Sequence, residues 1–483
     1  EKVLADVIAR YHRLRGEKVF FLTGVDQHGQ KVQQSAEKQG IAPAEFVRTI
    51  TEQFVALWKK LHAEYAGWAA TTEQLHTDCV QKILQRLVDE DQLYKAKQGG
   101  YYSVRQEQFL TDKERGPDGE FGPEWGQVEY REEENYYFRL AQHRDWLLDL
   151  IESRPDLITP EFRRVELRNA VEKLSGDLCI SRPKLRLEWG IELPFDRDYV
   201  TYVWFDALVN YISFAPGGYD ATAPNEEFNR WWPARIVIGK DILIPAHGIY
   251  WMIMLHALGF ANDEMPRLIV HGWWNIGGAK MSKSLGNVVD PNELADKFSA
   301  DALRYYLMSD IATGRDADFS LERLIARYNG DLANSLGNLL NRSLNMAKRY
   351  RAGVVRPKGG DSPLRAHAET AITAFDREMR QFHPQAALAA VTDFATACNT
   401  YIDNVAPWKM AKDPDRAEAL DHVLYALIES LRIIAILMSP ITPDAARQML
   451  FQINCEGGAL EWGGIADGHC VGEAKPLFPR IEI

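Results

Sequence analysis

The first ninety residues alternate between helical patterns and short apolar runs, and this alternation is the strongest constraint on the fold. Residues 2–15 have the apolar spacing of a helix, Gly16 interrupts it, and the apolar run 19–23 follows. Further helical patterns occupy residues 30–39 and the segment that begins at Pro43. Helices that alternate with strands connect the strands of a parallel sheet, so this part of the chain predicts an α/β fold.

The pattern changes twice farther along the chain. Residues 94–199 are marked by turn-forming Gly and Pro residues and short aromatic runs typical of β-structure, so we interpret this segment as an insertion. Apolar runs then restore the alternation at 202–205, 235–238 and 267–270. Beyond Asp331 the apolar residues fall at helical spacing, which predicts a helical bundle. The clearest such series is Leu388, Val391, Ala395, Cys398 and Ile402.

Composition and charge are those of a globular protein. The 483 residues are 46% hydrophobic and 26% charged, which is typical of chains that fold around an apolar core. With 56 basic and 68 acidic residues the net charge is −12, so nucleic-acid binding requires a local basic patch. The five cysteines form no Cys-x-x-Cys pair, which disfavours a zinc site and predicts reduced thiols in the cytoplasm. Residues 242–261 are uncharged but contain Pro245 and two histidines, and we interpret them as a buried helix.

The segment from Lys280 to Asn287 reads Lys-Met-Ser-Lys-Ser-Leu-Gly-Asn and places two lysines three positions apart. Lysines can neutralise the charge of a polyphosphate, while backbone N–H groups and serine hydroxyls donate to its oxygens. Two lysines alone are also typical of a solvated surface loop. The complete string resembles, letter for letter, the Lys-Met-Ser-Lys-Ser loop of class I aminoacyl-tRNA synthetases. That resemblance implies that Lys280 and Lys283 are catalytic.

A second motif, Gly24-Val25-Asp26-Gln27-His28-Gly29, follows the first apolar run. It places a carboxylate and an imidazole at the carboxyl end of a strand, which is the edge where parallel sheets bind ligands. Taken alone, Asp26 is more often a turn residue or a helix cap. The motif is similar to a strand end in methionyl-tRNA synthetases, and this resemblance implies that Asp26 binds the α-ammonium group of methionine.

Two further blocks, residues 202–211 and 239–250, resemble the same family. Aromatic walls suit a polarisable thioether, although without the resemblance each aromatic residue would be interpreted as core. The resemblance implies that the methionine-binding residues are Asp26, Trp204, Tyr211, His247 and Tyr250. It implies that the ATP-binding residues are Gly239, Asp241, Lys280, Met281, Ser282, Lys283 and Ser284, with Asp241 near the ribose.

The chain departs from the family pattern at three places. Met252 follows Trp251 where the family is expected to have proline, a difference that bears on where the local helix starts. The phosphate-binding His-Ile-Gly-His motif of the family is expected a few residues before Glu1, and none of the 12 histidines lies in such a motif. In addition, residues 101–130 lack the cysteines that form zinc knuckles in many relatives. We therefore predict that the protein holds no structural zinc.

The helical part of the chain contains a local basic patch. Residues 332–360 include six lysines and arginines and no acidic residue. Such a segment can be a solvated helix whose basic end complements its dipole. It can also contact phosphates while a nearby aromatic residue stacks on an unpaired base. The synthetase resemblance favours the second interpretation and implies that Asn338, Arg342 and Trp408 read the CAU anticodon.

The resemblance extends to the end of the chain and implies an α/β fold of the class I type: a Rossmann-type parallel sheet with an inserted connective domain, then an all-α anticodon-binding bundle. The predicted segments are the first half of the Rossmann catalytic domain (1–93), the connective insertion without a zinc knuckle (94–199), the second half of the Rossmann domain (200–270), the lysine loop with a stem-contact region (271–330) and the anticodon-binding domain (331–483).

The implied activity is that of a cytoplasmic methionine–tRNA ligase, a monomer that binds no membrane. ATP, carried with Mg²⁺, and L-methionine would form methionyl-adenylate and pyrophosphate, and methionine would pass to the 3′ end of tRNA(Met) for initiation and elongation of translation. One alternative is a non-catalytic tRNA-binding relative or fragment of a class I synthetase. Another is a leucine or valine enzyme, but those usually carry a large editing insertion, for which 94–199 is too short.

Overall fold

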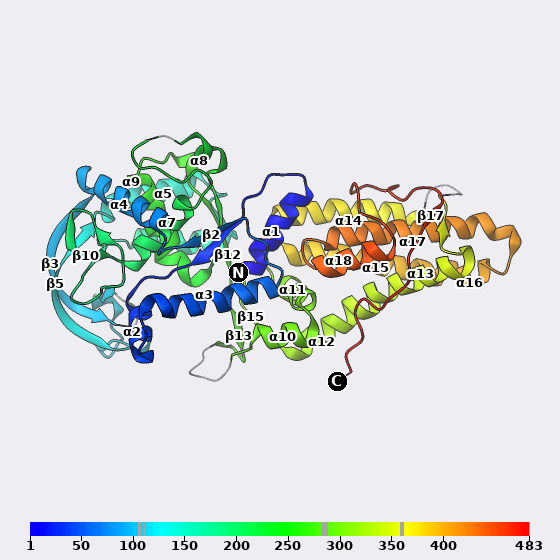
Figure 1. Ribbon diagram of the computed structural model, residues 1–483, viewed down its shortest axis with the longest axis horizontal. Coiled ribbons are helices and arrows are strands. Elements are labelled where there is room, and N and C mark those ends of the chain that lie inside the picture. Colours follow the sequence, from blue (N-terminus) through cyan, green and yellow to red (C-terminus); the bar gives the residue numbers. More distant parts are fainter. Residues whose placement is uncertain (105–107, 111, 224, 282–287, 358–361, 483) are drawn as a thin grey trace. The chain divides into compact units, whose positions relative to one another are not determined.

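The computed structural model describes residues 1–104, 108–110, 112–223, 225–281, 288–357 and 362–482 (Figure 1). The chain divides into two compact units, which are interleaved in sequence. The first unit consists of Glu1–Phe21, Ala56–Glu64 and His271–Ile483. The second consists of Leu22–Val55 and Tyr65–Val270.

Parallel strands form the centre of the second unit, as the alternating pattern predicts. β1 (Leu22–Val25) pairs with β2 (Gly67–Ala70), and β12 (Arg267–His271) pairs with β6 (Ile158–Thr159), both in parallel. β11 (Arg235–Gly239) lies on the other side of β12. Glycine is needed at position 24 of β1, because a Cβ atom there would lie 1.9 Å from a carbonyl oxygen of β2.

The predicted helices near the start of the chain are confirmed, and two strand predictions need correction. The helices are α1 (Lys2–Leu14), α2 (Gln30–Gln39) and α3 (Pro43–Lys60). The strand predicted at 19–23 begins only at Leu22, where pairing with β2 begins. The run at 202–205 begins not a strand but the helix α7 (Val203–Ser213), whose buried residues Phe205, Leu208, Val209 and Ile212 have helical spacing.

The uncharged stretch is buried helical structure, as predicted. It forms a π-helix, η5 (Leu243–Trp251), which continues into α9 (Met252–Ala257). Trp251 and the next four residues are fully buried, so this segment is core of the second unit. Across the described ranges, no helix is both long and apolar enough to cross a membrane.

The segment after residue 94 is mainly β-structure, as its aromatic runs predict. β3 (Leu93–Ser103) and β5 (Val128–Phe138) pair antiparallel along their full length of 11 residues. The short strands β4 (Gln108–Leu110) and β7 (Leu178–Cys179) flank them. In the connection between β4 and β5, the guanidinium of Arg115 lies 4.4 Å from the ring centre of Phe121 and 4.7 Å from that of Tyr101. This cation–π cluster organises the connection.

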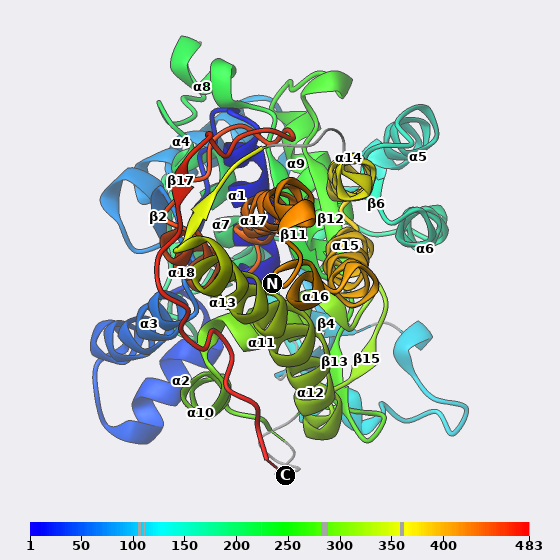
Figure 2. The same cartoon turned by 90° about the vertical axis from the view of Figure 1, so that its right-hand side faces the viewer.

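The first unit is largely helical beyond Asp331, which confirms the predicted bundle. Its main helices are α13 (Asn338–Arg351), α14 (Pro363–Arg380), α15 (Pro384–Val405), α17 (Ala417–Met438) and α18 (Pro443–Gln452). The view in Figure 2 looks along the bundle, in which α14, α15 and α17 contact one another. The predicted apolar series on α15 is buried throughout.

A buried ion pair fastens α1 within the first unit. Arg304 of α11 (Ala300–Ser309) is fully buried, and its Nη2 donates to Asp6 Oδ2 at 2.6 Å. The same guanidinium donates to the carbonyl oxygens of Leu61, Pro440 and Ile441. Burial lowers the pKa of Arg304, although the negative charge of Asp6 opposes this. One side chain therefore joins four segments that are far apart in sequence.

Candidate functional site

The residue predicted to bind the methionine ammonium lies at the carboxyl end of β1. Asp26 directly follows the strand and is exposed. Its neighbour Gln27 is buried and held from two sides. The Gln27 backbone N–H donates to Thr71 Oγ1 at 3.0 Å, and Trp189 Nε1 donates to the Gln27 carbonyl oxygen at 2.5 Å. The turn that presents Asp26 is therefore fixed by its surroundings.

Two of the predicted methionine-binding side chains, Trp204 and Tyr211, contact a third, His247. Tyr211 of α7 lies with its hydroxyl oxygen 2.8 Å from Nε2 of His247 on η5, and the Trp204 ring meets His247 edge-on with centroids 6.1 Å apart. The other nitrogen, Nδ1, is 2.9 Å from the Ile242 carbonyl oxygen. Because a carbonyl oxygen can only accept, Nδ1 carries a proton, and in the neutral imidazole Nε2 then accepts from the Tyr211 hydroxyl. The Tyr211–His247 pair thus has a defined direction.

Tyr250, the fifth predicted methionine residue, lies on η5 three residues after His247. It is half-buried, and burial raises the pKa of its hydroxyl to about 12. The phenol therefore stays protonated at neutral pH and can act as a hydrogen-bond donor.

A buried carboxylate that sequence reasoning missed connects α7 to the end of β1. Asp206 is 1% exposed; one of its oxygens lies 2.6 Å from Nδ1 of His28 and the other 2.7 Å from Nε2 of His76. Nδ1 of His76 lies 2.8 Å from Ser213 Oγ. Burial raises the pKa of Asp206, but hydrogen bonds and charge from the two histidines outweigh this and bring it below its usual value. No signal in the sequence relates position 76 to position 206.

Two of the residues predicted to bind ATP, Gly239 and Asp241, lie where β11 ends. Gly239 is the last residue of the strand and is buried, and Asp241 follows in the short helix η4 (Lys240–Ile242), where it is exposed. The carboxyl end of a strand in a parallel sheet is the edge at which nucleotides bind, so the location agrees with the predicted role.

The lysine loop starts from a tight hairpin in the first unit. β13 (Trp274–Ile276) and β14 (Ala279–Lys280) pair antiparallel, and the two glycines between them have φ of 59° and 77°. A two-residue turn with positive φ at both positions strongly favours glycine. The backbone of Lys280 ends β14, and Met281 follows it, half-buried. The predictions for Ser282, Lys283 and Ser284 lie outside the described residues.

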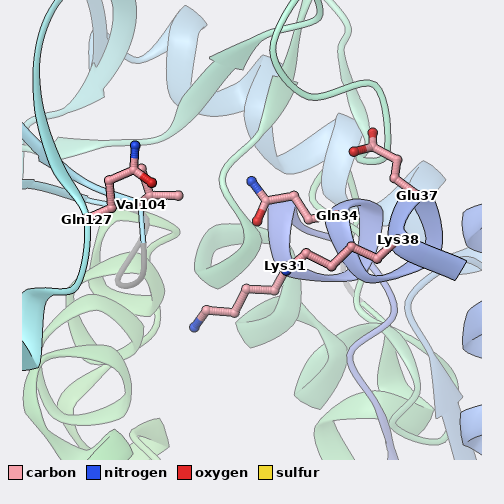
Figure 3. A pocket seen from close by; sticks show the side chains of 6 residues that line it. All are labelled: Lys31, Gln34, Glu37, Lys38, Val104 and Gln127. Carbon is pink, nitrogen blue, oxygen red and sulfur yellow. The ribbon is translucent and has the colours of Figure 1, made fainter.

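A separate groove of about 770 Å³ lies between α2 and the inserted strands (Figure 3). Lys31, Gln34, Glu37 and Lys38 line it from α2, and Val104 and Gln127 line it from the ends of β3 and β5. None of the predicted methionine-binding or ATP-binding residues is among these lining residues. The groove is therefore distinct from the side-chain cluster around Tyr211.

The predicted anticodon residues lie on the helical bundle. Asn338 begins α13 and is exposed, and Arg342, one turn later, donates to Asp403 Oδ1 of α15 at 2.6 Å. Trp408 lies five residues beyond Asp403, on α16 (Pro407–Met410), and is 39% exposed. Arg351 also pairs with an acidic residue, Asp421 of α17. The basic patch is thus partly neutralised by carboxylates from other helices.

In the described part of the chain, no group of three His, Cys, Asp or Glu side chains is arranged to hold a metal ion. The expectation that the protein holds no structural zinc stays a prediction.

Comparison with known proteins extends these observations to the whole chain. The family model described as "tRNA synthetases class I (M)" matches residues 1–118 and 125–344, and the "Anticodon binding domain of methionyl tRNA ligase" matches residues 356–469. The methionine–tRNA ligase of Lactococcus lactis subsp. lactis is 37% identical over 500 residues, which cover 100% of this chain and 74% of the relative. That of Caldanaerobacter subterraneus subsp. tengcongensis is 40% identical over 494 residues, covering 100% and 76%.

The fold is also similar to that of a solved structure. The crystal structure of Mycobacterium tuberculosis methionyl-tRNA synthetase bound by methionyl-adenylate matches with a TM-score of 0.92 at 33% identity, covering 99% of this chain and 95% of that one. The family models account for most of the chain, and the relatives match it at well above 30% identity along its whole length. The chain therefore belongs to the methionine–tRNA ligase family of class I aminoacyl-tRNA synthetases.

Proposed function

We propose that the chain activates L-methionine with ATP and transfers the methionyl group to the 3′ end of tRNA(Met). The observation that carries the proposal is the contact of Trp204 and Tyr211 with His247, which the resemblance assigns to the methionine side chain. Relatives across the full chain are methionine–tRNA ligases, and a solved relative was crystallised with methionyl-adenylate, the product of the first step.

In the first step, a methionine carboxylate oxygen attacks the α-phosphorus of ATP and pyrophosphate leaves. Asp26 accepts from the α-ammonium group and thereby orients the carboxylate, while aromatic side chains enclose the thioether. Lys280 and Lys283 neutralise the charge that develops on the departing pyrophosphate. Mg²⁺ bound with ATP would supply further positive charge at the phosphates. Asp241 lies near the ribose, and Gly239 also contacts ATP.

In the second step, a hydroxyl of the terminal tRNA ribose attacks the methionyl carbonyl and displaces AMP. Recognition of the tRNA is assigned to the bundle, where Trp408 stacks on an anticodon base and Asn338 and Arg342 bind base edges. The site of the reaction is the cytoplasm. The active form is a monomer, and light scattering of the purified protein tests this oligomeric state.

The proposal is tested with the full-length protein by methionine-dependent exchange of pyrophosphate into ATP and by charging of a tRNA with a CAU anticodon. We expect both activities with methionine, and neither with leucine or valine at equal concentration. Comparable exchange with leucine or valine would show that the amino-acid assignment is wrong. Binding of the tRNA without any exchange would instead identify a non-catalytic relative.

A further inference from the structure

We propose that Asp206 is a positioning residue for methionine, which acts by holding His28 at the end of β1 through the hydrogen bond that His28 Nδ1 donates. The inference rests on the proposed function and deepens it, because it adds two residues to the methionine site. Asp206 itself is placed behind His28 and touches no substrate.

The direction of the two hydrogen bonds to Asp206 follows from its chemistry. Its lowered pKa leaves a carboxylate, and a carboxylate only accepts hydrogen bonds. His28 must therefore donate from Nδ1 and His76 from Nε2, at 2.6 and 2.7 Å. The other nitrogen of His76, Nδ1, lies 2.8 Å from Ser213 Oγ.

The exposed fraction of the side chains differs from one end of this hydrogen-bond network to the other. The side chain of His76 is fully buried and Ser213 is 2% exposed, whereas the side chain of His28 is 10% exposed. His76 is also stacked on Phe214, with ring centroids 5.7 Å apart and planes 12° from parallel. His76 and Ser213 are thus the interior support, and His28 is the end that reaches the surface beside Asp26.

The network also connects the two segments that are predicted to bind methionine. His28 lies two residues after Asp26, the predicted ammonium partner, and Asp206 lies two residues after Trp204, in the predicted side-chain pocket. One short hydrogen bond therefore sets the spacing between the loop after β1 and the helix α7.

The test uses the full-length protein and three variants: Asp206→Asn, His28→Gln and the double variant. Methionine-dependent pyrophosphate exchange gives KM for methionine and for ATP. We expect each single variant to raise the methionine KM about tenfold, with the ATP KM and kcat within twofold of wild type. The double variant should be no more than about twofold worse than either single variant, because both changes remove the same interaction. Ile212→Val, which trims a buried side chain on the same helix, should leave both KM values within twofold.

Several outcomes would overturn the proposal: additive effects in the double variant, equal increases in both KM values, or a methionine KM unchanged in His28→Gln. If Asp206→Asn does not fold, nitrogen-15 NMR of the histidine-labelled wild type decides, because His28 must carry its proton on Nδ1. A proton on Nε2 instead would refute the inference. A wild type without methionine-dependent exchange would refute the proposed function, whereas an active wild type with unaffected variants would refute only the role of Asp206.

Discussion

Replacing Tyr211 with Phe removes a single hydroxyl and tests whether the Tyr211–His247 pair shapes the methionine site. His247 is 2% exposed, and its Nδ1–H is already bonded to the Ile242 carbonyl oxygen. The change therefore leaves Nε2 as a buried acceptor without its donor, which costs roughly 1–3 kcal/mol. A water molecule can satisfy Nε2 while the pocket is empty, but methionine must displace it, so the cost falls on methionine binding.

From this reasoning, we expect Tyr211→Phe to weaken methionine binding by about 2 kcal/mol, which corresponds to roughly thirtyfold. KM for methionine and for ATP are measured by pyrophosphate exchange, and the ATP value should change less than about twofold. Tyr219→Phe is the matched control, because the Tyr219 hydroxyl contacts Arg86 and not the predicted site. A wild-type methionine KM in Tyr211→Phe, or an equal rise in the ATP KM, would refute the reasoning.

Four other changes separate chemistry, substrate binding, recognition and folding. Lys283→Ala should slow pyrophosphate exchange at least about a hundredfold, because the change removes one charge-stabilising donor. Methionine affinity, measured by equilibrium titration, should change little. Normal exchange would exclude Lys283 from the mechanism. Asp26→Ala should weaken methionine binding by about 2 kcal/mol in the same titration, less than a buried ion pair because Asp26 is exposed; unchanged affinity would contradict its role. Trp408→Ala should lower tRNA affinity by roughly 1–2 kcal/mol in a binding assay, with normal exchange, because its 39% exposure offers only part of the ring for stacking; loss of both activities would indicate a structural residue. Arg304→Met should destabilise the first unit by about 3 kcal/mol in thermal unfolding, since Asp6 keeps its hydrogen bond from Arg10; an unchanged midpoint would show that the pair contributes little.

Local patterns were sufficient for the motifs and for most helices. The apolar series on α15 and the lysine string each lie within a short stretch of sequence. Periodicity identifies the first and residue type the second. Contacts between residues that are far apart in the sequence could not be predicted in this way. Asp206 bonds to residues 130 and 178 positions away, and neither His76 nor His28 has a neighbouring residue that indicates such a partner.

The basic patch shows a related limit of sequence reasoning. Counting charges over residues 332–360 finds no acid, but the only elements in the described part of this window are the end of η8 (Tyr328–Gly337), α13 and the short strand β16 (Val354–Val355). In the bundle, Asp403 of α15 and Asp421 of α17 lie against Arg342 and Arg351. The charge available to an RNA is therefore smaller than the sequence window indicates. Recognition must depend more on the geometry around Arg342 and Trp408 than on net charge.

The helix that replaces the strand predicted at 202–205 has a functional consequence. Side chains seven positions apart lie on the same face of a helix, whereas residues two apart diverge by about 200°. Trp204 and Tyr211 can therefore line one pocket from α7 while Asp206, between them in sequence, lies buried against His28 and His76. In a strand, Trp204 and Asp206 would share a face and Tyr211 would lie opposite. Only the helical form lets residues 204–211 place the two side chains predicted to bind methionine on one face of α7 and Asp206 on another, against His28 in the loop after β1.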